Sequence, residues 1–132
     1  MGVVNGPCLA IVCGMTPKEM CERTMLFALR SIRLAENLPK NYAGRNAGGQ
    51  LVRCATSVAA NYRATQRARS RPDFSNKIGI VLEETDEAAF WFELIVRGDL
   101  LPKKQVAELQ AEAEELTSIF AAMRKTVVSG PR

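Results

Sequence analysis

The sequence predicts an all-α protein folded as an antiparallel, up-down-up-down four-helix bundle. Apolar residues recur at gaps of three and four along most of the chain, which is the period of a helix with one buried face. Capping residues, prolines and glycines divide this pattern into four segments. The links between the segments are short, so consecutive helices should lie side by side and run in opposite directions.

Composition fits one globular domain. The chain has 132 residues, of which 47% are hydrophobic and 24% are charged, enough for a sizeable core. No apolar run approaches the roughly 18 residues of a membrane span. The four cysteines form no C-x-x-C pair and histidine is absent, so neither a metal site nor a cofactor is expected. A cytoplasmic location is the expectation from this cysteine usage.

The first helix is expected from Thr16 to about Asn37. Thr16 and Glu19 form a capping-box pattern around Pro17, and Leu38-Pro39 should end the helix. We expect the bundle to occupy residues 15–128, between a poorly ordered tail at 1–14 and a frayed end at 129–132.

The second helix is expected from about Gly49 to Arg69. Residues 41–49 include three glycines and are interpreted as the preceding loop. The expected inward positions of this helix are Val52, Ala55, Ala59, Tyr62 and Gln66, flanked by Leu51 and Val58.

The third helix should begin at Ser70, with Pro72 in its first turn, and end with Gly98 at the C′ position. Its apolar stripe comprises Phe74, Ile78, Val81, Thr85, Ala88, Phe92 and Ile95. The fourth helix carries an unbroken 3,4 pattern at Val106, Leu109, Ala113, Leu116, Phe120, Met123 and Val127. Such a pattern is typical of a bundle seam.

A second apolar set on the third helix, comprising Ile80, Trp91 and Leu94, does not fit its main stripe. Exposing it would leave an apolar patch that soluble monomers seldom tolerate. The sequence therefore predicts a homo-oligomer with these residues at the interface.

Polar residues on the second and third helices should meet in structural pairs. Arg53 and Asn61 lie on the second helix, and Glu83, Glu84 and Glu87 on the third. We expect Arg53 to pair with one of these glutamates in a buried contact that fixes helix register rather than performing catalysis.

The best functional candidate is a basic cluster formed by Arg63, Arg67, Arg69 and Arg71, with Lys77 nearby. Residues 53–77 carry six basic side chains and one acid, whereas residues 83–115 carry ten acids and three bases. Guanidinium groups suit a phosphate backbone, but no aromatic residue separates the arginines, so base stacking is not indicated. The alternatives are a solvated helix end or pairing with acidic helices.

No set of residues indicates an enzyme. The lack of histidine removes the Glu-x-x-His ligands of di-iron bundles and the usual nucleophile–histidine pairs. No glycine-rich phosphate-binding motif occurs. The aligned glutamates of the third helix are interpreted as partners of neighbouring arginines.

Three segments resemble the family of four-helix-bundle proteins first noticed in intervening sequences of bacterial 23S ribosomal RNA genes. Residues 50–61, QLVRCATSVAAN, resemble the family pattern Q-L-x-R-A-x-x-S-[IV]-x-A-N. Residues 67–74 resemble its basic turn, and residues 81–94 its E-E-x-D-E…F-W-x-E-L form. The likeness covers about residues 16–125, but Tyr-Arg-Ala at 62–64 replaces the common A-E-G. Met15-Thr16-Pro17 resembles the family's start, so residues 1–14 are expected to be an extension.

The resemblance implies a ring-shaped homopentamer of bundles. It also implies kinship with the accessory protein of diversity-generating retroelements, which works with a reverse transcriptase and RNA. The first hypothesis is therefore a non-enzymatic, oligomeric protein that binds RNA or DNA. The alternative is a protein–protein scaffold whose arginines meet acidic helices of another molecule.

Overall fold

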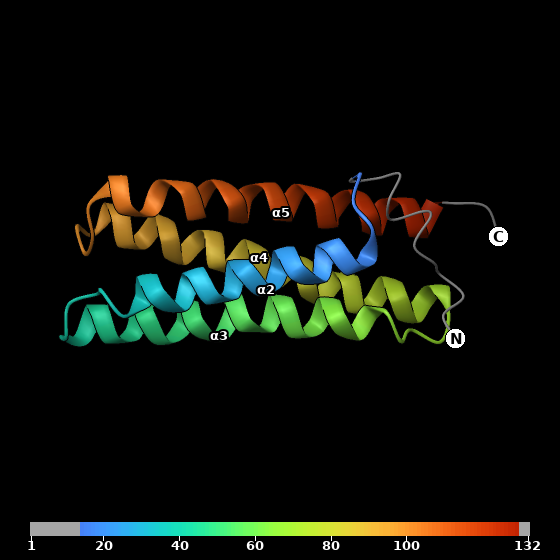
Figure 1. Ribbon diagram of the computed structural model, residues 1–132, viewed down its shortest axis with the longest axis horizontal. Coiled ribbons are helices and arrows are strands. Elements are labelled where there is room, and N and C mark those ends of the chain that lie inside the picture. The colour runs from blue at the N-terminus through green and yellow to red at the C-terminus, as the bar shows by residue number, and fades with distance from the viewer. Residues whose placement is uncertain (1–13, 130–132) are drawn as a thin grey trace.

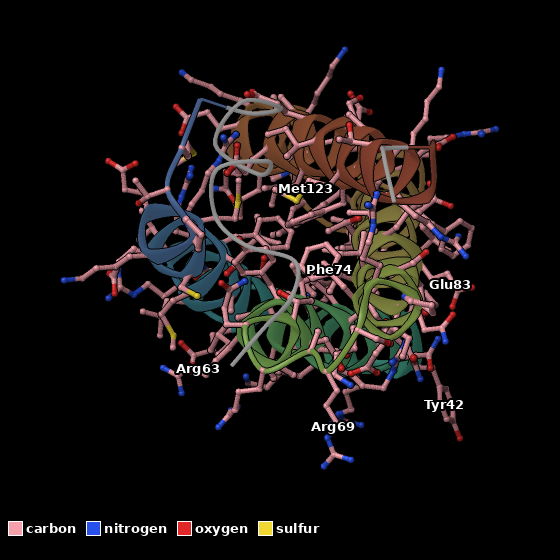
Figure 2. The ribbon with its side chains drawn as sticks, turned by 90° about the vertical axis from the view of Figure 1, so that its right-hand side faces the viewer. Tyr42, Arg63, Arg69, Phe74, Glu83 and Met123 are labelled. Atoms are coloured by element: carbon pink, nitrogen blue, oxygen red, sulfur yellow. The ribbon has the colours of Figure 1, made fainter. Side chains whose placement is uncertain are left out.

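The computed structural model describes residues 14–129 as four α-helices joined by short links (Figure 1). They are α2 (Pro17–Ala35), α3 (Tyr42–Thr65), α4 (Arg71–Arg97) and α5 (Lys103–Ser129). Viewed along the bundle, the helices occupy the corners of a square in chain order (Figure 2). α2 thus lies diagonally opposite α4, and the predicted up-down-up-down bundle is confirmed. Apart from Gly14 and Ser129, the predicted tail and frayed end lie outside the described residues.

Two of the predicted helix starts follow from local capping. The Thr16 hydroxyl accepts from the Glu19 amide at 3.1 Å, and Glu19 Oε1 accepts from the Thr16 amide at 2.8 Å. This confirms the capping box. Ser70 caps α4 by accepting from the Asp73 amide at 3.1 Å.

No helix in the described part of the chain is long and apolar enough to cross a membrane.

The C-terminal end of α4 differs from the prediction by one residue. Gly98 is the C-cap with φ −85°, and Asp99, at φ 56°, occupies the left-handed position that follows it. The Leu100 amide donates to the Ile95 carbonyl at 2.9 Å, and the Asp99 amide to the Val96 carbonyl at 3.1 Å. These are the two hydrogen bonds of a Schellman motif. Aspartate is one of the few residues other than glycine that tolerate this conformation.

The start of α3 contradicts the prediction, because the expected glycine loop is helical. Asn41 caps the helix by accepting from the Gly44 amide at 2.9 Å. A Cβ atom at Gly44 would lie 1.8 Å from the Pro39 carbonyl oxygen, and one at Gly48 would lie 3.3 Å from Leu38 Cδ1. These glycines therefore let the end of α2 and its link pack directly on the α3 backbone.

The core contains the predicted stripes of α4 and α5, whose members are all buried. On α3 the inward face differs slightly from the prediction: Cys54 is buried, Val52 and Ala59 are half-buried, and Gln66 is exposed. The helix also ends at Thr65 instead of continuing to Arg69. Residues 66–70 form the link to α4, which leaves Gln66 outside the core.

α2 packs along α3 but makes a smaller contact with α5. Ion pairs help to join α2 to α5. Arg23 makes a two-point contact with Glu112, through Nε to Oε2 and Nη2 to Oε1, both at 2.8 Å. It also lies 3.1 Å from Glu115. Arg30 and Glu108 form a second bridge at 2.8 Å. Two-point arginine–carboxylate pairs are directional, so Arg23 helps to orient α2.

Cys54 provides a test of this packing. Burial, with smaller contributions from Glu87 and Glu84, raises the pKa of its thiol to about 12. Because the thiolate is the reactive form, iodoacetamide at about pH 8 should label Cys54 in the folded protein more than about a hundredfold slower than in urea. Peptide mass spectrometry after timed quenching measures this ratio. Equal rates in the two conditions would contradict the buried position.

Candidate nucleic-acid interface

The α3–α4 link brings together only part of the predicted basic cluster. Ala68 is buried and holds the link against the bundle, while Arg67 and Arg69 on either side of it are exposed. A hollow of about 660 Å³ lies at this point. Its lining consists of Ala64, Arg67, Arg69, Ser70, Asp73 and Lys77.

Asp73 organises the hollow. Its carboxylate accepts from the Arg69 amide at 2.9 Å and from Lys77 Nζ at 3.0 Å. The backbone hydrogen bond from Arg69, followed by the Lys77 hydrogen bond, lowers the pKa of this carboxyl. Lys77 is thus partly neutralised, and the Ser70 hydroxyl already accepts from the Asp73 amide in the first turn of α4. The charges available to a ligand are the guanidinium groups of Arg67 and Arg69.

Arg71 and Arg63 lie apart from the hollow. Arg71 Nη2 donates to the Val127 carbonyl at 2.7 Å and so ties the start of α4 to the end of α5. Arg63 is exposed on the α2 side of α3, where its charge acts on the Cys21 thiol. Figure 2 shows Arg63 and Arg69 pointing away from the bundle in different directions. The expected set therefore separates into a pair at the hollow and two arginines with other surroundings.

Two basic residues near this end come from α5 and were missed by the sequence analysis. Arg124 and Lys125 belong to the last turns of α5, at the same end of the bundle as the α3–α4 link (Figure 1). A Cβ atom at Gly79 of α4 would lie 3.2 Å from Arg124 Cζ, so this glycine makes room for the guanidinium. The signal was topological: antiparallel helices place the end of α5 beside the start of α4.

Arg53 makes contacts between α3 and α4, as the sequence led us to expect, but the contact is exposed. Its Nη1 lies 3.3 Å from Glu84 Oε1, and its Nη2 lies 2.5 Å from Glu87 Oε2. The Arg53 hydrogen bond lowers the pKa of Glu87, and Trp91 Nε1 donates to the same carboxylate at 3.2 Å. The Arg53 side chain is 47% exposed, so this is not the buried pair that was predicted. Solvent weakens such a pair.

The other two residues predicted for these polar pairs lie elsewhere. Asn61 Nδ2 donates to the carbonyl oxygen and the hydroxyl of Ser57, one turn earlier in its own helix. Glu83 is exposed and points away from the bundle on the α4 side (Figure 2). Neither residue makes the expected contact between helices, because the Asn61 amide is engaged within α3 and Glu83 points outward from α4.

The predicted second apolar face of α4 is present but discontinuous. Phe90 is 52% exposed, and its ring packs edge-on against Trp91 at a centroid distance of 5.0 Å. Leu94, one turn after Phe90, is half-buried. Ile80, at 45% exposure, lies ten residues before Phe90, about 15 Å along the helix. Sequence reasoning omitted Phe90.

A further exposed apolar group lies on α2 and was also missed. It comprises Met25, Leu26 and Leu29, which are 40%, 55% and 45% exposed. Its signal in the sequence is an apolar set one turn apart on the helix side opposite Met20, Thr24 and Phe27.

Within residues 14–129 there is no group of three or more histidine, cysteine, aspartate or glutamate side chains placed to hold a metal ion.

Comparison with known proteins establishes the family. The model of the 23S rRNA-intervening sequence protein family matches residues 18–122. The chain belongs to this family. The resemblance drawn from the three sequence segments is thus confirmed for 105 of the 132 residues.

A solved member supports the same assignment. The crystal structure of a protein of unknown function from the S23 ribosomal protein family of Bacteroides thetaiotaomicron is 28% identical to this chain. The two superpose with a TM-score of 0.74 over 85% of this chain and all of the other. No curated protein matches the chain. For this intervening-sequence protein the comparisons therefore establish family and fold, and function must be argued from the surface.

Proposed function

We propose that this intervening-sequence protein is a non-enzymatic, ring-forming oligomer that binds nucleic acid, RNA foremost, through Arg67 and Arg69. The observation that carries the proposal is the hollow at the α3–α4 link. Both guanidinium groups are exposed beside it, and neither forms an ion pair with another described residue. The acid in its lining, Asp73, is already engaged by Lys77 and the Arg69 amide.

Such a surface favours contact with the phosphate backbone. No aromatic side chain is among the residues that line the hollow, so bases would have no platform on which to stack. Phosphate contacts hold a nucleic acid without reading its sequence. We therefore expect weak sequence preference and an affinity that falls steeply with salt.

Assembly is the second part of the proposal. Two exposed apolar groups, on α2 and α4, are unusual for a small soluble monomer. Burial against other copies would remove them from water, and the family resemblance suggests five subunits. Each copy would add one arginine pair, so an RNA long enough to reach several pairs would bind more tightly than one pair permits.

The direct test is the double substitution Arg67→Glu with Arg69→Glu. The wild-type protein should bind a single-stranded RNA of about 30 nucleotides with micromolar or lower Kd at about 50 mM salt. The variant should lose at least about a hundredfold in affinity, since two attractive contacts become repulsive. Fluorescence anisotropy at several salt concentrations measures both Kd and the salt slope.

The matched control is Lys103→Glu with Lys104→Glu, which changes net charge by the same amount. Both lysines are exposed at the start of α5, at the opposite end of the bundle (Figure 1). This control should retain most of the affinity. Failure of the wild-type protein to retain RNA or DNA at about 50 mM salt would contradict the proposal.

One observation favours the scaffold alternative for part of the cluster. Arg63 faces away from the hollow, and the acids Glu83 and Asp86 of α4 are exposed without an ion pair among the described residues. In that alternative, basic side chains of one molecule meet the acidic α4 of another. Co-purification from cells with and without nuclease, followed by sequencing and mass spectrometry, separates protein partners from nucleic-acid partners.

A further inference from the structure

The two exposed apolar groups lie on opposite faces of the bundle. We call Met25, Leu26 and Leu29 the α2 patch, and the exposed Phe90 with the half-buried Trp91 and Leu94 the α4 patch. α2 and α4 occupy diagonal corners of the bundle (Figure 2). The two patches therefore cannot cover each other within one molecule.

The patches also lie at the same height along the bundle. In the core, the rings of Phe27 on α2 and Phe92 on α4 meet edge-on at a centroid distance of 6.2 Å. Every member of either patch is within two residues of its own phenylalanine, or about 3 Å along the helix. The two helices run in the same direction because one antiparallel helix separates them.

From this geometry we infer that the α2 patch of one copy packs on the α4 patch of the next copy. A rotation about an axis parallel to the bundle keeps every residue at its height, so it brings the two patches together without a shift. Contact between unlike surfaces is heterologous: it closes a ring when the rotation between copies divides a full turn, and otherwise continues as an open array. The inference rests on the proposed assembly and specifies which surfaces form it.

Charge supports the same pairing. Arg63 lies near Cys21, six residues before Phe27, and Glu83 lies nine residues before Phe92. Measured from the level of Phe27 and Phe92, these positions lie about 9 Å and about 14 Å towards the N-terminal ends of α2 and α4. The difference between the two heights, about 5 Å, can be spanned by an arginine side chain. Both residues are exposed, and Figure 2 shows them on opposite sides of the bundle. Between neighbouring copies they become partners of opposite sign.

Two variants, each with one damaged patch, test the inference. Leu26→Glu with Leu29→Glu damages the α2 patch and leaves the α4 patch intact. Phe90→Glu does the converse. Each variant alone should be a monomer, and an equimolar mixture should form a 1:1 heterodimer through the one intact pair of patches. Size-exclusion chromatography with light scattering measures the masses, and circular dichroism checks that each variant is folded.

The outcomes are distinct. If each patch instead packs on its own copy, either variant alone would still dimerise and the mixture would give nothing new, which overturns the inference but keeps the proposed assembly. A monomeric wild-type protein at micromolar concentration would overturn the assembly itself. RNA binding by isolated monomers is measured separately, so a failure of the Arg67 and Arg69 site is recognised independently.

The charge pair has its own test. Arg63→Glu should weaken assembly, and adding Glu83→Arg to the same chain should restore it, because neighbouring copies then carry the reversed pair. Lys103→Glu, at an exposed lysine at the opposite end of the bundle, is the control for the same change of charge and should leave assembly unchanged. Failure of the second substitution to restore assembly would overturn the proposed register between copies.

Discussion

Gly44→Ala should destabilise the bundle severely, whereas Gly49→Ala should stabilise it slightly. Both glycines lie in the first third of α3, and both substitutions add one methyl group. At Gly44 the new Cβ would lie 1.8 Å from the Pro39 carbonyl oxygen, and at Gly49 it would meet no atom within 4 Å. A backbone atom cannot rotate aside as a side chain can, so the link between α2 and α3 must move.

The two substitutions should change the free energy of unfolding in opposite directions. Overpacking a well-packed site costs about 1–3 kcal/mol and sometimes more, and we expect Gly44→Ala to reach at least about 3 kcal/mol despite its better helix propensity. Gly49→Ala should gain about 0.5–1 kcal/mol from propensity alone. Urea unfolding followed by circular dichroism at 222 nm measures both. A Gly44→Ala protein as stable as wild type would show that Pro39 does not approach the helix this closely.

The same glycines explain where sequence reasoning succeeded and failed for the fold. Capping boxes and 3,4 periodicity are local signals, and they placed α2, α4 and α5 correctly. At the start of α3, local propensity disfavours a helix, since three glycines occur within six residues. The compensating factor is the close approach of Pro39 and Leu38 to the α3 backbone. A contact of this kind depends on the tertiary fold and leaves no local pattern.

The candidate site shows a similar division. The sequence could identify a basic segment, because charge is a property of composition. It could not show that Arg71 reaches the end of α5, that Arg63 faces α2, or that Lys77 is paired with Asp73. Those directions depend on where α3 stops, and it ends four residues earlier than its pattern suggested. Arg67 and Arg69 can be recognised as a pair beside the hollow only when the position of the α3–α4 link is known.

The opposing apolar patches were half visible in the sequence. Trp91 and Leu94 are outside the main stripe of α4 and could be assigned to an outer face. Leu26 and Leu29 on α2 received no assignment from the sequence, and their outward position follows from the burial of Met20, Phe27 and Leu34. The relative height of the two patches follows from the Phe27–Phe92 contact, which no sequence pattern indicates.

Phe92→Ala and Phe90→Ala should separate folding from assembly, although they make the same change two residues apart. Phe92 is fully buried against Phe27, whereas Phe90 is 52% exposed. Removing a buried phenylalanine ring should cost about 3–5 kcal/mol of unfolding free energy, from lost transfer energy and the cavity left behind. Removing Phe90 opens no cavity in the core and should change the stability of an isolated subunit little.

Protein concentration distinguishes the two effects, because association stabilises a folded subunit by mass action. The Phe92→Ala protein should melt well below wild type at every concentration. The Phe90→Ala protein should match wild type when both are dilute enough to be monomeric, and should lack the rise in Tm that wild type shows as concentration increases. Melting curves over about a hundredfold range of concentration measure this. If Phe90→Ala lowered Tm equally at all concentrations, Phe90 would support the fold of the subunit, and the α4 patch would lose its place in the assembly.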